Sequence, residues 1–173
     1  STFIAKLDSS GKLLWHKPFG YDSINNIRLT MANIGVSINK YNQLEFFINS
    51  DSRKLIFNVD TIDEGWHAVK LDLNGSFIQS KRLPFKDYQN SPSNLKTNID
   101  ANGNYYFHGS FQRDTLFLLN DTIVRDGQNV ANGIVLAIDS NAHYKWSFVS
   151  NNSYDPITSG KVLGDTIFTS INV

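Results

Sequence analysis

The stretch "FIAKLDSSGKLLW" (Phe3–Trp15) decides the fold, because the chain repeats it. It returns as "HAVKLDLNGSFIQ" (His67–Gln79), 64 residues later, and as "IVLAIDSNAHYKW" (Ile134–Trp146), a further 67 residues on. Self-similarity of this kind is the signature of an array of supersecondary units. The equivalent positions carry three aspartates, two glycines and an alanine, and two tryptophans and a glutamine: Asp8, Asp72 and Asp139; Gly11, Gly75 and Ala142; Trp15, Gln79 and Trp146.

A second register runs between these copies. "INKYNQLEFFINS" (Ile38–Ser50) matches "IDANGNYYFHGSF" (Ile99–Phe111) at an offset of 61, and the same offset carries "LIFNVDTI" onto "LFLLNDTI". An insertion of six residues around "RDGQNVANG" explains the later shift from 61 to 67. Phe46, Phe107 and Phe168 follow at equal spacings of 61, and we expect all three in the core.

Each unit has the pattern of strands separated by turns. "TFIAKLD" and "WHAVKLD" alternate apolar and polar residues, and "DSSG", "DLNG", "DANG" and "DGQN" have turn compositions. In the second unit the expected strands are roughly 34–40, 43–50, 65–72 and 77–83, with a short hairpin arm near 54–62. A repeated four-stranded unit is typical of a propeller blade. The predicted class is all-β, a β-propeller-type array of four-stranded antiparallel blades.

The predicted organisation is one propeller-type region over 1–173. Residues 1–20 would end a blade, 34–84 and 95–150 would each form a blade with an extra arm, and 157–173 would start a blade. These parts amount to about three blade equivalents, whereas closed propellers usually have about four to eight blades. We therefore expect a fragment of a larger propeller, or closure with another copy of the chain.

The pattern "FIAKLDSSGKLLWHKPFG" resembles the bacterial SBBP-type β-propeller repeat, which reads approximately F-hydrophobic-A-K-L-D-x-x-G-x-x-x-W. "DANGNYYFHGSF" is similar to the strand that precedes it in that family. The chain departs from the pattern at Gln79, at Ala142 and in its longer period. The resemblance implies a Bacteroidetes-type exported or surface protein, with an extracellular or outer cell-surface location.

Composition excludes several function classes. Sixteen basic residues balance sixteen acidic ones, which argues against nucleic acid or an anionic membrane as partner. Cysteine is absent, so disulfides and thiolate metal sites are excluded. No apolar run approaches the roughly 18 residues of a membrane helix, and we expect no membrane insertion.

The aspartate turns and the histidines have structural interpretations. "DSSGKLLWHKPF" carries one acidic residue, too few for a calcium loop, so the sequence favours a hairpin turn. His16, His67, His108 and His143 lack metal-motif spacing. The cluster of Asp60, Asp63 and Glu64, with Asp51 and Arg53 nearby, is interpreted as a solvated loop. The sequence predicts no catalytic residue, cofactor or metal.

Two surface features are candidates for function. Loop aromatics could form a sugar- or peptide-stacking surface: Tyr21, Tyr41, Trp66, Tyr88 and Tyr154. Asp followed by Ser or Thr and an aliphatic residue resembles the O-glycosylation acceptor pattern of exported Bacteroidetes proteins, and the acceptors would be Ser23, Thr61, Thr115, Thr122 and Thr166.

The predicted function is a non-catalytic exported or cell-surface propeller module, a scaffold whose loops bind a protein or glycan partner or hold an assembly. Its other partners would be the remaining blades of a longer chain or another copy. One alternative is the propeller domain of a polysaccharide-acting enzyme, a glycosidase or lyase, with two carboxylates about 5–9.5 Å apart. The other is a purely structural spacer in a longer surface protein.

Overall fold

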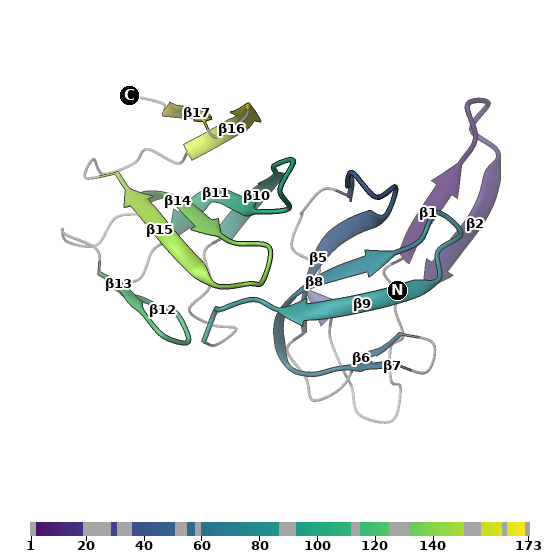
Figure 1. Ribbon diagram of the computed structural model, residues 1–173, viewed down its shortest axis with the longest axis horizontal. Helices are drawn as coiled ribbons and strands as arrows, with labels where there is room; N and C mark the ends of the chain where they lie inside the picture. The colour runs from purple at the N-terminus through teal and green to yellow at the C-terminus, as the bar shows by residue number, and fades with distance from the viewer. Residues whose placement is uncertain are drawn as a thin grey trace. The chain divides into compact units, whose positions relative to one another are not determined.

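The computed structural model describes residues 3–18, 29–30, 36–50, 55–57, 60–86, 93–111, 115–124, 132–150, 157–163 and 166–171. These residues form strands, bridges, turns and bends, without helix, which confirms the all-β class. The chain divides into two compact units, one of Ser1–Met31 with Val36–Arg82 and one of Ala32–Gly35 with Leu83–Val173 (Figure 1).

The first unit contains a five-stranded antiparallel sheet. Its main strands are β5 (Leu44–Ser50), β8 (Gly65–Leu71) and β9 (Phe77–Arg82), and the short strands β3 (Leu29–Thr30) and β4 (Ser37–Ile38) both pair with β5. The arm expected near 54–62 is the hairpin of β6 (Leu55–Phe57) and β7 (Asp60–Ile62). Strands β4, β5, β8 and β9 correspond to the four strands expected from the sequence.

The core of the first unit lies between this sheet and a separate hairpin, β1 (Phe3–Leu7) and β2 (Leu13–Pro18). Alternation along a strand places Phe46 and Ile48 of β5 on one face, with Val69 and Leu71 of β8. Ile4 of β1, Ile62 of β7 and Trp15 of β2 pack against that face, so the hairpin covers the sheet. Burying a side chain of this size stabilises the fold by roughly 1.5–3 kcal/mol.

Two hydrogen bonds fix the position of this hairpin. Lys6 Nζ and Trp15 Nε1 each donate to the Leu73 carbonyl, both at 3.1 Å. Gly75 allows the close approach, because a Cβ there would lie 3.1 Å from the Trp15 ring. Trp15 thus packs between two neighbouring blade-like sheets, as the sequence predicts.

The second unit contains a four-stranded antiparallel sheet in the order β10 (Ser93–Ile99), β11 (Tyr105–Phe111), β14 (Asn132–Ile138) and β15 (Tyr144–Val149). The short strands β12 (Thr115–Phe117) and β13 (Thr122–Val124) form its arm. A last hairpin, β16 (Ile157–Leu163) and β17 (Thr166–Ile171), lies beside β10, β11 and β14. Phe85 meets Phe107 edge to face in the core, with ring centroids 5.8 Å apart.

The repeat extends to residue pairing. Phe46 lies opposite Val69, and the equivalent Phe107 lies opposite Leu136. Each of the three hairpins that begin with the repeated Asp stretch also carries a one-residue bulge at the same place: Leu14, Ile78 and Lys145. A bulge is a defined backbone feature that re-aims a strand. The units therefore share one backbone design, built from blade-like antiparallel sheets.

The expectation that Phe168 belongs to the core is wrong. Phe46 and Phe107 are fully buried, but Phe168 is 59% exposed. The first two phenylalanines lie on strands with neighbours on both sides, whereas β17 forms a two-stranded sheet with β16. A side chain on a two-stranded sheet has fewer neighbours to cover it, so the same sequence position is exposed.

Candidate functional site

The five tight turns of the sheets share one hydrogen-bonding geometry. In the first, the Asp8 carboxylate accepts the backbone N–H of Ser10 at 2.9 Å and that of Lys12 at 3.0 Å. The same two bonds occur in the turns that begin at four other residues: Asn39, Asp72, Asp100 and Asp139. The turn interpretation of the repeated aspartates is confirmed.

The fourth residue of each turn has a positive φ, which favours glycine. Gly11, Gly75 and Gly103 occupy it in three turns, with φ between 80° and 83°. Asn42 and Ala142 adopt the same left-handed conformation, with φ of 57° and 69°. Asn does so readily and Ala only with strain, so the substitution of Ala142 for Gly keeps the turn at an energetic cost.

The turn hydrogen bonds also set the charge state of the aspartates. The Ser10 hydroxyl and the Lys12 N–H lower the pKa of Asp8, and the Ser76 N–H lowers the pKa of Asp72. Burial alone would raise the pKa of Asp100 and Asp139, but the bonds that their carboxylates accept outweigh it, and both pKa values are lowered. These carboxylates are ionised and hold their own loops, which makes them poor general acids or bases.

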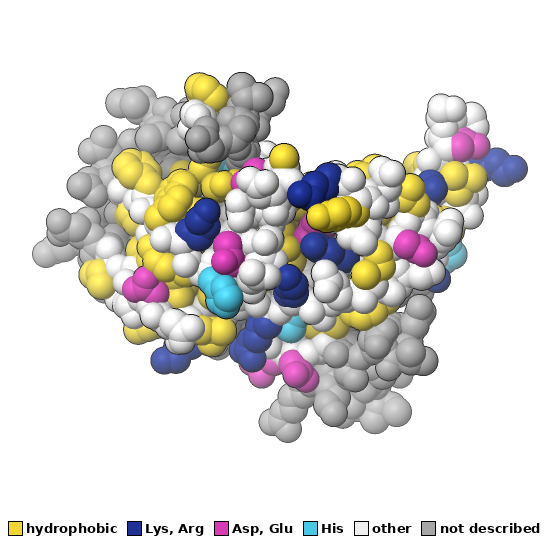
Figure 2. Space-filling model, viewed as in Figure 1, with side chains coloured by type: hydrophobic (Ala, Val, Ile, Leu, Met, Phe, Trp, Pro, Cys, Tyr) yellow, Lys and Arg dark blue, Asp and Glu magenta, His cyan; other side chains and the backbone are white. Residues whose placement is uncertain are grey.

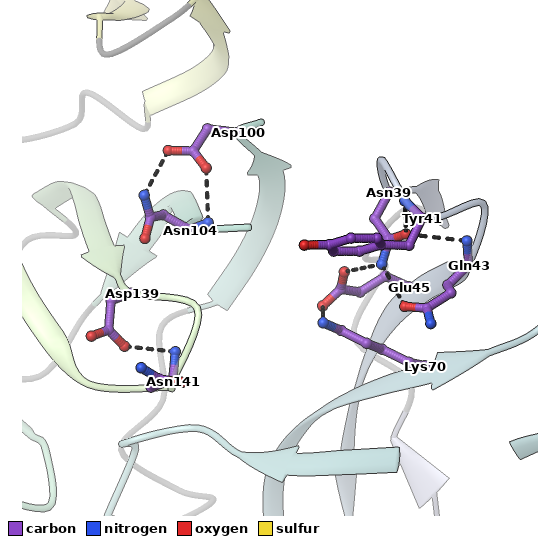
Figure 3. A network of polar contacts seen from close by, with 9 residues as sticks. All are labelled: Asn39, Tyr41, Gln43, Glu45, Lys70, Asp100, Asn104, Asp139 and Asn141. Carbon is purple, nitrogen blue, oxygen red and sulfur yellow. Dashed lines mark hydrogen bonds and ion pairs between the residues drawn. The ribbon is translucent and has the colours of Figure 1, made fainter. Parts of the chain in front are cut away.

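A polar network of the first unit joins such a turn to the sheet beneath it. Glu45, only 1% exposed, lies opposite Lys70 on the neighbouring strand, and Lys70 Nζ is 3.4 Å from its carboxylate (Figure 3). The Asn39 amide donates to Gln43 Oε1 at 3.0 Å and to Glu45 Oε2 at 3.4 Å. The buried carboxylate is thus paired and hydrogen-bonded, as a buried charge must be.

This network supports an exposed aromatic ring. Tyr41 lies at the tip of the turn, is 68% exposed and donates its backbone N–H to Asn39 Oδ1 at 2.9 Å. Lys40 Nζ lies 5.3 Å from the centre of the Tyr41 ring. The ring is therefore open to solvent on a loop whose backbone is fixed, an arrangement that suits stacking on a sugar or a peptide.

The second unit carries different chemistry at the equivalent positions. Tyr106 replaces Glu45, Ala137 replaces Lys70, and Trp146 replaces Gln79. Tyr106 donates its hydroxyl to Asp100 Oδ2 at 3.1 Å, and its ring lies 6.3 Å from that of Trp146, which is 41% exposed. One row of the sheet is ionic in the first unit and aromatic in the second, so the repeat fixes the backbone and leaves this row variable.

The four histidines do not converge. His16 and His143 are exposed, and His143 Nδ1 lies 3.4 Å from Asp139 Oδ2. His67 and His108 are buried in β8 and β11, and burial lowers the pKa of both rings, with the Arg82 charge as a second cause at His67. Within the described ranges, no group of three or more His, Asp or Glu side chains could hold a metal ion.

The candidate stacking residues divide into three groups. Tyr41 is exposed as expected. Trp66 does not offer a stacking surface: it lies in β8 opposite Asn49 and is 3% exposed, because it fills the interior of the first unit. Tyr21, Tyr88 and Tyr154 lie outside the described residues.

The candidate glycosylation acceptors also lie in different settings. Thr122 of β13 and Thr166 of β17 are exposed, and Thr115 of β12 is half-buried. Thr61 lies in β7, and Ser23 lies outside the described residues. In the acidic cluster, Asp60 ends the arm, and Asp63 and Glu64 are exposed in the connection to β8; Asp51 and Arg53 lie outside the described residues.

Sequence reasoning missed the Glu45–Lys70 pair. Its signal was a glutamate inside the apolar run "LEFFI", opposite a lysine of the repeated "AVKL" stretch. Such a glutamate on a buried strand calls for a cation across the sheet, but only the register identifies which one.

Fold and site together define a class: an all-β repeat chain of blade-like antiparallel sheets whose recurring carboxylates stabilise turns. A comparison with models of known protein families finds no match, and a search of the curated proteins finds none. In the part of the chain that the structure describes, no helix has the length and apolarity to cross a membrane.

Proposed function

We propose that this chain is a non-catalytic, exported or cell-surface module of the β-propeller type, with about three blade equivalents, that acts as a binding and assembly scaffold. The observation that carries the proposal is the repeated turn. The acidic groups that recur along the chain are bound to their own backbone N–H groups, so the conserved design of the repeat serves shape. Fold alone does not fix function, which is why the argument rests on these side chains.

Binding would use residues that the repeat leaves variable. Tyr41 is the candidate for which the described geometry is most favourable, because the ring is exposed while Asn39 and Glu45 fix the turn beneath it. A rigid aromatic side chain loses little conformational entropy on contact with a ligand. We propose a glycan of the cell surface as the ligand class for this loop.

The proposed location rests on the resemblance to SBBP-type repeats and on the acceptor pattern around Thr122 and Thr166. Both of these side chains are exposed, which O-glycosylation requires. A mass spectrum of the protein isolated from its native cells should exceed the mass of the bare polypeptide. A mass equal to that of the bare polypeptide would count against export through a glycosylating pathway.

A panel of bacterial cell-surface polysaccharides tests the function directly. We expect at least one polysaccharide to retard the protein in an affinity gel, with no release of reducing ends or unsaturated sugars. Tyr41→Ala should weaken that binding by about tenfold, because an aromatic contact contributes of the order of 1 kcal/mol. Asn74→Ala, at the same place in another turn, is the matched control and should bind as the parent. Release of sugar products would identify a glycosidase or lyase instead.

A further inference from the structure

Strands β1 and β17 each belong to a two-stranded sheet, β1 with β2 and β17 with β16 (Figure 1). The repeat makes β1 equivalent to β8 and β14, and it makes β17 equivalent to β5 and β11. In both larger sheets these equivalents are neighbours, since β5 pairs with β8 and β11 pairs with β14. The edge strands β1 and β17 are therefore the two halves of a pairing that the chain makes twice elsewhere.

Both larger sheets give the same register for that pairing. Phe46 lies opposite Val69; two steps of 61 carry residue 46 to Phe168, and one step back of 64 carries residue 69 to Ala5. Phe107 lies opposite Leu136; one step of 61 leads to Phe168, and steps back of 67 and 64 lead to Ala5. The agreement of two independent sheets fixes Phe168 opposite Ala5, and hence Ile167 opposite Lys6 and Thr166 opposite Leu7.

The side chains on one face of these strands are exposed only here. Phe3 is 60% exposed, Leu7 57% and Phe168 59%, and hydrophobic side chains lie at the surface of the β1–β2 hairpin (Figure 2). Their equivalents in the second unit, Ile134, Ile138 and Phe107, are all 0% exposed. Positions that form the core in a larger sheet thus remain uncovered in the two hairpins, and an unpaired strand edge accompanies them.

We propose that β17 of one copy pairs with β1 of a second copy of this chain, antiparallel and with Phe168 opposite Ala5. The proposal rests on the scaffold function above and names its assembly partner. Reciprocal pairing would be a closed two-fold contact. Two chains would contribute two larger sheets each, and the two composite sheets β16–β17–β1–β2 would make six. Six falls within the usual range of about four to eight blades, whereas closure within one chain would give three.

The register is chemically compatible. Leu7 faces Thr166, Lys6 faces Ile167 and Ala5 faces Phe168, so no two like charges oppose each other. Because β16 lies against β10, β11 and β14 of its own unit, the partner's second unit accompanies its β17. That unit provides the apolar cover that Phe3 and Leu7 lack in the single chain.

Cysteine pairing tests both the partner and the register, because the chain has no cysteine of its own. Ala5→Cys and Phe168→Cys proteins are mixed and oxidised. We expect a mixed disulfide between the two chains. The control mixes Ala5→Cys with Ile167→Cys; it should react at least about tenfold more slowly, because a slip of one residue puts the thiols on opposite faces. Equal rates in the two mixtures, or no mixed disulfide in either, would overturn the proposal.

Light scattering without crosslinks gives the second measurement. The parent should have twice the 19.5 kDa mass of the chain. Phe168→Lys should be monomeric, and Val124→Lys, which replaces a residue that is 68% exposed on the arm, should remain dimeric. A monomeric parent, or a dimer that Phe168→Lys leaves intact, would overturn the pairing without affecting the scaffold function. Sugar product release would have the opposite effect.

Discussion

Asn39 and Glu45 form a hydrogen bond whose direction is reversed at the equivalent pair of the second unit. The Asn39 amide donates to the Glu45 carboxylate at 3.4 Å, whereas the Tyr106 hydroxyl donates to the Asp100 carboxylate at 3.1 Å. In the first unit the turn supplies the donor, and in the second unit the strand supplies it. The repeat therefore preserves a link between turn and strand while exchanging its chemistry.

Asn39→Asp should destabilise the first unit. The new carboxylate would lose the bonds to Gln43 and Glu45 and would place a second negative charge beside Glu45, which is 1% exposed. The expected cost is about 1–2 kcal/mol at neutral pH, measured by urea unfolding. Asn74→Asp in an exposed turn is the control and should change stability little. Equal stability of the two variants would show that the link is not energetically significant.

Gly75→Ala should be more harmful than Gly11→Ala. Both glycines have φ near 80°, so each substitution carries backbone strain of about 1–2 kcal/mol. A Cβ at Gly75 would also lie 3.1 Å from the Trp15 ring, whereas a Cβ at Gly11 meets nothing within 4 Å. The difference between the two unfolding free energies measures the packing of the β1–β2 hairpin on the sheet. No difference would mean that Trp15 adjusts without cost.

The reverse change, Ala142→Gly, should raise stability. Ala142 holds the left-handed conformation at φ of 69°, which Gly adopts without strain. The gain is expected to be below about 1 kcal/mol, because Gly also has more backbone freedom to lose on folding. Thermal unfolding of the two proteins checks this, and a lower midpoint for the glycine variant would contradict the turn geometry.

Acidification should weaken the fold in two separate pH windows. The pKa of His67 and of His108 is lowered in the folded state, so the unfolded chain binds more protons and stability falls as the pH drops below the ordinary value of 6.5. The turn aspartates also have lowered pKa values, and their contribution is lost only below about 3.8.

Histidine substitution separates these windows. His108→Phe, with the residue that the first unit has at this position, should reduce the loss of stability between pH 7.5 and pH 5 in urea unfolding. The exposed His16 is the control, and His16→Gln should leave the slope unchanged. An unaltered slope in His108→Phe would mean that this ring is protonated at no cost inside β11.

Much of the backbone can be predicted from the sequence because the repeat constrains it twice. Three copies of the stretch around Asp8 locate the turns, and alternation locates the strands of both sheets. The bulges at Leu14 and Ile78 were not predictable, since a bulge shifts pairing without changing composition.

Burial was less predictable than pairing. Phe168 has the same local sequence position as Phe107, yet its exposure depends on whether another strand lies beside it. Glu45 presents the opposite case. Its burial depends on Lys70, which is distant in sequence and becomes its neighbour only through the register.

The central claim is that the recurring aspartates stabilise turns and neither bind metal nor catalyse. Asn39 already makes the same two backbone hydrogen bonds in the fifth turn, so an amide should replace the carboxylate. The most direct measurement is thermal unfolding, with and without calcium, of the parent and of a triple variant, Asp8→Asn, Asp72→Asn and Asp139→Asn. We predict that the variant folds and self-associates as the parent does, and that calcium shifts neither midpoint. A calcium-dependent rise in the parent that disappears in the variant would contradict the account.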